Sequence, residues 1–158
     1  AGATRQVIGV FSAAWQRTMA EVLRLLGSEH AMIVHSAGLD EIRLDAPSKV
    51  VELKAGTIEE YEISPSDFEI QLAHAGDVAK LAADSTESSL SLVRSAISQA
   101  DTPEADIVAL NAGAAIYVSN VATTFANGVA MAQDAIASGL AKERLEELIR
   151  VSSMMGES

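Results

Sequence analysis

Two adjacent carboxylates, Asp40 and Glu41, combine residue types and a position that suit metal chemistry. They follow residues 31–34, a short apolar run typical of a buried strand, and the break at residues 36–38. Ligands of open α/β sheets gather at the carboxyl ends of strands, and Mg²⁺ prefers oxygen ligands. The pair therefore indicates a candidate Mg²⁺ site. The competing interpretation is that both carboxylates are solvated loop charges or helix caps.

A histidine and a glycine lie close to this pair. His35 directly follows the apolar run, so it is a candidate acid, base or metal ligand. No second His or Cys lies nearby, which favours a half-buried imidazole that orients the loop through hydrogen bonds. Gly38 is expected to permit the tight turn that directs Asp40 and Glu41.

A strand, a helix and a strand are predicted to position the carboxylates. Residues 6–10 form an apolar run, and Ser12 can then cap a helix that ends near Gly27. Residues 31–34 provide the second strand, so the unit is expected to be parallel with a right-handed crossover. The apolar face predicted for the helix consists of Trp15, Met19, Val22, Leu23 and Leu26.

A hairpin is predicted next. Residues 48–54 and 57–63 are rich in Val, Leu, Ile and Tyr and flank the turn dipeptide Ala55-Gly56. Three glutamates alternate with apolar residues in the second arm. Their alternation favours a solvated strand face over a cation site.

The second half of the sequence is predicted to be helical, with caps at Asp84 or Ser85, at Thr102, and at Thr123 or Thr124. Asn111 lies in an apolar stretch, where a buried structural hydrogen bond is the preferred interpretation over a ligand-binding amide. Gly113 in the same stretch is expected to permit close packing, since glycine inside a helix costs about 1 kcal/mol relative to alanine. A final helix over residues 141–152 is predicted to turn Leu145, Leu148 and Ile149 inward, with a frayed end after it.

Composition sets the outer limits. The 158 residues, of which 49% are hydrophobic and 4% aromatic, suit one domain over residues 1–158 with an aliphatic core. A net charge of −11 argues against nucleic acid and anionic membranes as partners. There is no cysteine, no apolar run of membrane-spanning length and no signal peptide pattern, so a cytoplasmic protein is expected.

Three segments occur in an order and spacing typical of one enzyme family: RQVIGVFS, HSAGLDEI and LNAGAAIYVS. Together, over residues 5–150, they resemble the C-terminal half of the anthranilate phosphoribosyltransferase family. The resemblance implies that Asp40 and Glu41 bind the Mg²⁺ that accompanies phosphoribosyl pyrophosphate. No covalent nucleophile is predicted, because no Ser–His–Asp set is visible.

The same resemblance implies a pentosyltransferase of tryptophan biosynthesis. Such an enzyme transfers phosphoribosyl from phosphoribosyl pyrophosphate to anthranilate and releases pyrophosphate, and the intact family enzyme is a homodimer. Two other functions stay open, a related nucleoside phosphorylase-like enzyme and a non-catalytic α/β binding or assembly module.

The expected architecture is α/β in three layers, with a small mixed sheet flanked by helices and a helical C-terminal half. It corresponds to an incomplete catalytic domain of the nucleoside phosphorylase and phosphoribosyltransferase type. The family's glycine-rich pyrophosphate loop and most of its anthranilate contacts lie upstream of the matching segment and are absent from this sequence. We therefore expect a fragment that exposes a sheet edge or an apolar face and is inactive alone.

Overall fold

The sheet is mixed and has four strands in the part of the chain that a computed structural model describes, residues 2–70 and 81–156. β1 pairs with β2 in parallel, and β2–β3 and β3–β4 pair antiparallel. This order confirms the predicted parallel unit and the hairpin after it. The strands are β1 (Arg5–Gly9), β2 (His30–His35), β3 (Ser48–Lys54) and β4 (Thr57–Ile63).

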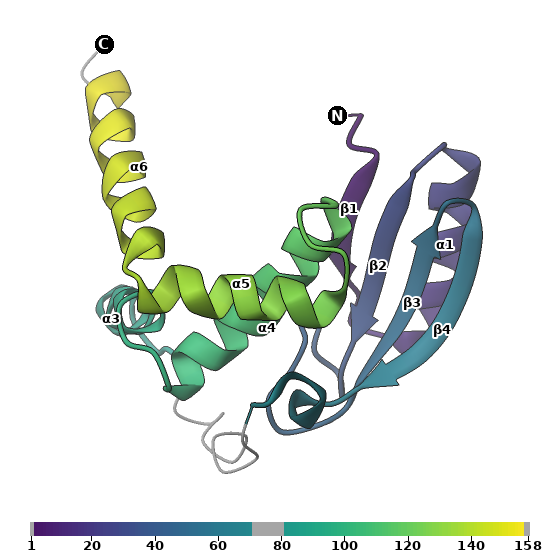
Figure 1. Ribbon diagram of the computed structural model, residues 1–158, viewed down its shortest axis with the longest axis horizontal. Helices are drawn as coiled ribbons and strands as arrows, with labels where there is room; N and C mark the ends of the chain where they lie inside the picture. The colour runs from purple at the N-terminus through teal and green to yellow at the C-terminus, as the bar shows by residue number, and fades with distance from the viewer. Residues whose placement is uncertain (1, 71–80, 157–158) are drawn as a thin grey trace.

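Helices cover both faces of the sheet, so the predicted three layers are confirmed (Figure 1). α1 packs on β2 and β3 from one side, while α4 contacts β1 and β2 from the other and α5 packs on α4. The α-helices are α1 (Gln16–Leu25), α3 (Thr86–Ala96), α4 (Pro103–Val118), α5 (Phe125–Ala137) and α6 (Leu140–Gly156); 3₁₀ turns span Ala13–Trp15 and Pro65–Phe68.

Local sequence signals account for most element boundaries. The side chains of Ser85, Thr102 and Thr124 each accept a backbone N–H bond at the start of α3, α4 and α5. This confirms Thr102 and selects Ser85 over Asp84 and Thr124 over Thr123. Ala55 and Gly56 have φ values of +49° and +82°, as both central residues of a type I′ hairpin turn require. Between residues 68 and 84 the sequence gives no clear pattern of helix or strand. Residues 71–80 of this segment lie outside the described residues.

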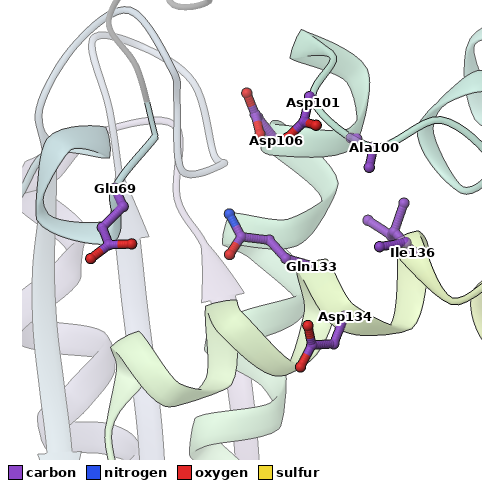
Figure 2. A pocket seen from close by; sticks show the side chains of 9 residues that line it. Glu69, Ala100, Asp101, Asp106, Gln133, Asp134 and Ile136 are labelled. Atoms are coloured by element: carbon purple, nitrogen blue, oxygen red, sulfur yellow. The ribbon is translucent and has the colours of Figure 1, made fainter.

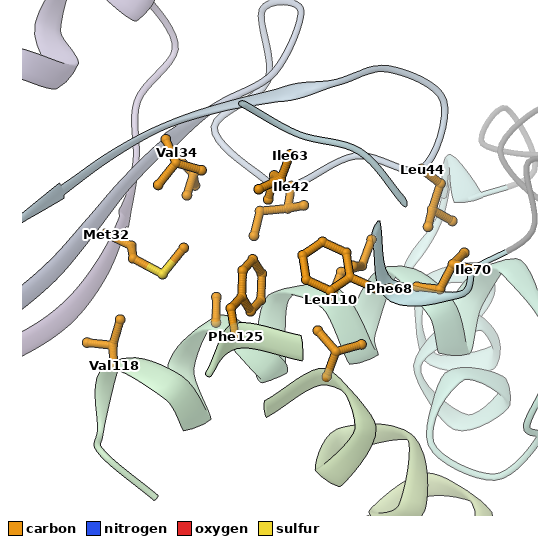
Figure 3. Packing of buried hydrophobic residues seen from close by; sticks show 13 residues of the cluster. Met32, Val34, Ile42, Leu44, Ile63, Phe68, Ile70, Leu110, Val118 and Phe125 are labelled. Carbon is orange, nitrogen blue, oxygen red and sulfur yellow. The ribbon is translucent and has the colours of Figure 1, made fainter. Parts of the chain in front are cut away.

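The larger apolar cluster lies between the sheet, α4 and α5 (Figure 3). Two of its members, Ile42 and Leu44, come from the β2–β3 loop and are 2% and 0% exposed. This loop also carries Asp40 and Glu41, so the buried side chains of Ile42 and Leu44 anchor the loop that holds the candidate site. Other members are Met32, Val34, Ile63, Phe68, Leu110, Val118 and Phe125.

Two glycines bring α4 and α5 into backbone contact. A Cβ at Gly113 would lie 2.6 Å from the backbone nitrogen of Val129, and one at Gly128 would lie 2.4 Å from the carbonyl oxygen of Gly113. These distances confirm that packing requires Gly113.

The apolar face predicted for the first helix is wrong in part. Leu23 is buried, but Trp15 is 54% exposed, Leu26 is 76% exposed and Val22 is also exposed. Trp15 belongs to the 3₁₀ turn that precedes α1, so the expected α-helical spacing does not begin at this residue.

The buried face of α1 instead passes through Gln16, Ala20 and Leu23. The side-chain nitrogen of Gln16 donates to the carbonyl oxygens of Ile33 and Lys49, each at 2.8 Å. A buried amide with two partners can face the sheet, and a hydrophobic pattern cannot detect this arrangement.

The inward face predicted for the last helix is also wrong. None of the residues of α6 is buried, and Leu148 and Ile149 are 64% and 51% exposed. The helix projects away from the sheet (Figure 1) and contacts α5 only in part, so Leu148 and Ile149 stay exposed. It also continues to Gly156 where fraying was expected. Across the described residues, the helices are too short or too polar to cross a bilayer.

The α4–α5 contact gives a first prediction. Gly113→Ala should lower the free energy of unfolding by about 1–3 kcal/mol, because the new methyl group overlaps the backbone of Val129. Urea unfolding measures this loss. Gly156→Ala is the control, since a Cβ there has no neighbour within 4 Å. Equal stability of the two variants would contradict the proposed packing.

Candidate functional site

The loop between β2 and β3 begins with a two-residue turn. Ser36 and Leu39 exchange backbone hydrogen bonds of 3.0 and 2.8 Å. Between them, Ala37 and Gly38 have φ values of +46° and +89°, which confirms the predicted tight turn at Gly38. The turn delivers Asp40 beside the carboxyl ends of the parallel strands β1 and β2, where the sequence predicted it.

Gly9, the last residue of β1, lies against the backbone of Asp40. A Cβ at this position would be 1.7 Å from the carbonyl oxygen of Asp40 and 2.9 Å from its Cβ. No side chain fits there, so the glycine leaves the space that Asp40 occupies. The sequence analysis missed this role, although a glycine within a strand often marks a close approach of another backbone.

Asn111 on α4 binds the loop directly after the carboxylate pair. Its Oδ1 accepts the backbone N–H of Ile42 at 3.1 Å, and its Nδ2 donates to the carbonyl oxygen of Ile42 at 3.0 Å. The same nitrogen donates to the carbonyl oxygen of Ile107 at 3.0 Å. These bonds confirm the structural interpretation of Asn111.

His35 orients the start of the loop, as predicted. Its Nδ1 lies 2.8 Å from the carbonyl oxygen of Val10. A carbonyl only accepts, so this nitrogen is the donor and carries the proton. The side chain of Ser36 donates to the carbonyl of Pro47 at 2.8 Å, so the two ends of the loop are also joined.

Both residues are exposed, and the negative charge of Asp40 acts on the carboxyl group of Glu41. Partial burial raises the pKa of Glu41, and the negative charge of Asp40 raises it further. In the same loop, Arg43 forms a two-bond fork with Asp45, at 2.6 Å for each bond. The bonds from Arg43 lower the pKa of Asp45. The guanidinium of Arg43, two residues after Glu41, is therefore already paired.

This chemistry fits one mode of Mg²⁺ binding. Within residues 2–70 and 81–156 there is no group of three or more His, Cys, Asp or Glu side chains arranged to hold a metal ion. A dedicated protein cage is therefore not what these residues offer. Mg²⁺ is commonly held by one or two carboxylates together with substrate phosphates and water, and Asp40 and Glu41 suit that arrangement.

A hollow of about 460 Å³ adjoins Asp40 and is mainly apolar. Phe11 and Trp15 line it, and both are exposed. Another hollow, of about 310 Å³, lies between the start of α4 and the end of α5 and is acidic (Figure 2). Its carboxylates belong to Glu69, Asp101, Asp106 and Asp134, so it is ill suited to an anionic substrate.

A buried polar cluster joins α4 to the sheet at the amino end of β2. The Glu52 carboxylate accepts bonds from Nε2 of His30 at 2.7 Å, from the hydroxyl of Tyr61 at 2.7 Å and from that of Tyr117 at 2.8 Å. Burial and the bond to Glu52 raise the pKa of Tyr61, so this hydroxyl stays protonated. The sequence analysis did not identify this cluster, because His30 and Glu52 are 22 residues apart.

Comparisons with known proteins agree on the family. The family described as "Glycosyl transferase family, a/b domain" matches residues 1–142. The chain is 49% identical over 98% of its length to an anthranilate phosphoribosyltransferase of Saccharophagus degradans, and covers 46% of that protein. It is 54% identical over 94% of its length to one of Marinomonas sp. (strain MWYL1), and covers 43% of it. The chain thus spans a little under half the length of these relatives.

Solved structures share the fold. One is anthranilate phosphoribosyltransferase from Thermus thermophilus, with a TM-score of 0.73 and 33% identity over 88% of this chain and 40% of that one. Another is the Saccharomyces cerevisiae enzyme in complex with PRPP and Mg. It has a TM-score of 0.77 and 24% identity over 94% of this chain and 43% of that one.

The electrostatic coupling of the carboxylates gives a second prediction. Asp40→Asn should lower the pKa of Glu41 toward its ordinary value without restoring it fully, because burial still raises it. NMR titration of the Glu41 carboxyl carbon measures the shift. The control is Glu59→Gln, which removes an equal charge from an exposed position of β4 outside the loop. A pKa of Glu41 that is unchanged by Asp40→Asn would show that the two charges do not interact.

Proposed function

This chain belongs to the glycosyl transferase family with an α/β domain, and from that premise we propose that it is the metal-binding portion of an anthranilate phosphoribosyltransferase. The proposed reaction transfers phosphoribosyl from phosphoribosyl pyrophosphate to the amino nitrogen of anthranilate and releases pyrophosphate, in tryptophan biosynthesis. The observation that carries the proposal is the likeness to enzymes of that name over 94–98% of the chain, a stretch that includes the Asp40–Glu41 loop.

The remaining expectations belong to the same proposal. Residues 1–158 act as one domain on small molecules, with neither nucleic acid nor a membrane as partner, in the cytoplasm. The intact enzyme is a homodimer. A net charge of −11 supports the exclusion of polyanionic partners. The names of the relatives favour the transferase over a phosphorylase-like enzyme or a non-catalytic module.

In this proposal Asp40 is the direct metal ligand, and Glu41 binds directly or through water. Bound Mg²⁺ supplies charge neutralisation for the pyrophosphate leaving group. The chain's own carboxylates attract the cation and repel a polyphosphate that arrives without it. Because the chain has a net charge of −11, basic residues from outside this segment complete the binding of the anionic substrate. The solved yeast enzyme of this fold, with PRPP and Mg, is consistent with such use.

A third prediction concerns metal binding. In calorimetric titrations, Mg²⁺ or Mn²⁺ should bind the 158-residue chain more tightly with phosphoribosyl pyrophosphate present than without it. The double variant Asp40→Asn/Glu41→Gln should weaken this binding by at least ~10-fold, because both ligand charges are lost.

The matched control is Glu59→Gln/Glu62→Gln. It removes the same charge from exposed positions of β4, outside the proposed site, and should retain the wild-type affinity. If the control and the site variant bind the metal equally, or if the folded wild-type chain binds none, the proposed role of the loop is wrong.

A fourth prediction concerns turnover. The purified chain should form no measurable phosphoribosyl anthranilate, because it spans 46% of a relative and lacks the family's glycine-rich pyrophosphate loop. A fluorescence assay of anthranilate consumption measures this. Appreciable turnover by the pure chain would overturn the proposal that this chain supplies only the metal-binding portion of the enzyme.

A further inference from the structure

We propose that Asn111 and Gly9 are positioning residues that hold the backbone of the Asp40–Glu41 pair in its metal-binding arrangement. The inference rests on the proposed function, because it assigns these residues to a site whose ligands are Asp40 and Glu41. Neither residue touches the metal in this scheme. Each acts on the backbone that carries a ligand.

The amide of Asn111 grips both polar backbone groups of a single residue, Ile42. One bond alone would permit rotation about the contact, whereas a donor and an acceptor together fix both distance and direction. We call this pair of bonds between Asn111 and Ile42 the clamp. Ile42 directly follows Glu41, so the clamp fixes the position of the backbone next to Glu41. The separation of 69 residues makes this a long-range support from α4 and not a local feature of the loop.

The third bond of Asn111 fixes the orientation of the amide. Its Nδ2 also donates to the carbonyl oxygen of Ile107, one turn earlier on α4. A flipped amide would direct its oxygen at the carbonyls of Ile107 and Ile42 and its nitrogen at an N–H group. The network therefore specifies one orientation, and the geometry offered to the loop is set before any ligand arrives.

The side chain of Ile42 adds an apolar anchor beside this clamp. It is 2% exposed and belongs to the same cluster as Leu110 and Ala114 of α4 (Figure 3). Leu110 precedes Asn111 in the chain, so α4 bonds to Ile42 through one residue and shares an apolar cluster with it through the residue before. Local opening of the loop at Ile42 must break both.

Gly9 supports the other ligand from the end of β1. The backbone of Asp40 lies where a side chain of residue 9 would be, with its carbonyl oxygen 1.7 Å from the Cβ position. Gly9 does not have a positive φ, so its role is to provide space and not an unusual backbone conformation. Any larger residue must push Asp40 away from the end of β1.

The test compares metal affinity with general stability. Mn²⁺ with phosphoribosyl pyrophosphate is titrated into the full chain carrying Asn111→Ala or Gly9→Ala. Loss of groups that orient metal ligands typically weakens affinity about 10–100-fold, and that range is expected for each variant.

The matched control for Asn111→Ala is Tyr117→Phe on the same helix. It removes the bond from α4 to Glu52 and so weakens the attachment of α4 without touching the loop. Gly56→Ala is the control for Gly9→Ala, because it strains a hairpin turn that has no part in the site. Both controls should keep the wild-type affinity.

A second readout follows the clamp without metal. Hydrogen exchange of the Ile42 amide should accelerate in Asn111→Ala and stay unchanged in Tyr117→Phe, because Asn111 is the acceptor of that N–H. This measurement judges the clamp even in a chain that binds no Mn²⁺. Unchanged exchange in Asn111→Ala would overturn the proposal.

The Mn²⁺ affinities of the variants distinguish failure of the positioning inference from failure of the proposed function. If Asp40→Asn/Glu41→Gln abolishes Mn²⁺ binding while Asn111→Ala and Gly9→Ala retain it, the positioning inference is overturned and the proposed function stands. If Asp40→Asn/Glu41→Gln retains binding, the proposed function itself fails. Loss in all three variants, with both controls unaffected, supports the inference.

Discussion

Helix α4 must pack against three different surfaces at once, and the arrangement of the molecule depends on this constraint. One side inserts Leu110 and Val118 into the sheet cluster, while Gly113 lets α5 approach to backbone contact. Between these, Asn111 reaches the β2–β3 loop, and near the end of the helix Tyr117 reaches Glu52. Asn111 contacts the loop from a helix that is packed on the sheet and on α5, so the path of α4 determines where this amide meets the loop. The position of the candidate ligands is therefore a consequence of how α4 is packed.

The polar contacts of α4 differ in kind at the two ends of β2. At the carboxyl end of β2, a neutral amide binds backbone groups and leaves the carboxylates of Asp40 and Glu41 exposed. At the amino end, Glu52 is buried and bonded to His30 and Tyr117. Loss of Glu52 would leave His30 and Tyr117 without this buried acceptor, at a cost to stability. The exposed pair instead keeps its negative charge available to a cation.

The sequence predicts what local rules determine. Alternation and a turn dipeptide gave both arms of the hairpin, and the caps near Ser85, Thr102 and Thr124 were predicted to within one residue because capping depends on neighbouring residues. Properties that depend on distant contacts were not predicted. The burial of Gln16 depends on two sheet carbonyls, those of Ile33 and Lys49, that lie far from it in the sequence.

The candidate site shows the same division between local and long-range information. The carboxylate pair and the turn at Gly38 could be inferred from residues 31–42, whereas the partner of Asn111 lies 69 residues away in the chain. Gly9 could be read as a strand residue but not as the neighbour of Asp40. For α6, the pattern gave the helix correctly, but an apolar stripe says nothing about whether a surface is present to cover it.

The central claim is that a divalent ion binds to the Asp40–Glu41 loop while the loop keeps the backbone position set by α4 and β1. The most direct measurement is a crystal structure of the chain with Mn²⁺ and phosphoribosyl pyrophosphate, with the ion located by its anomalous scattering. The account predicts an anomalous peak about 2.1 Å from an oxygen of Asp40, with both bonds between Asn111 and Ile42 intact. A peak bound by other residues, or a loop that has left Asn111 to reach the ion, would contradict it.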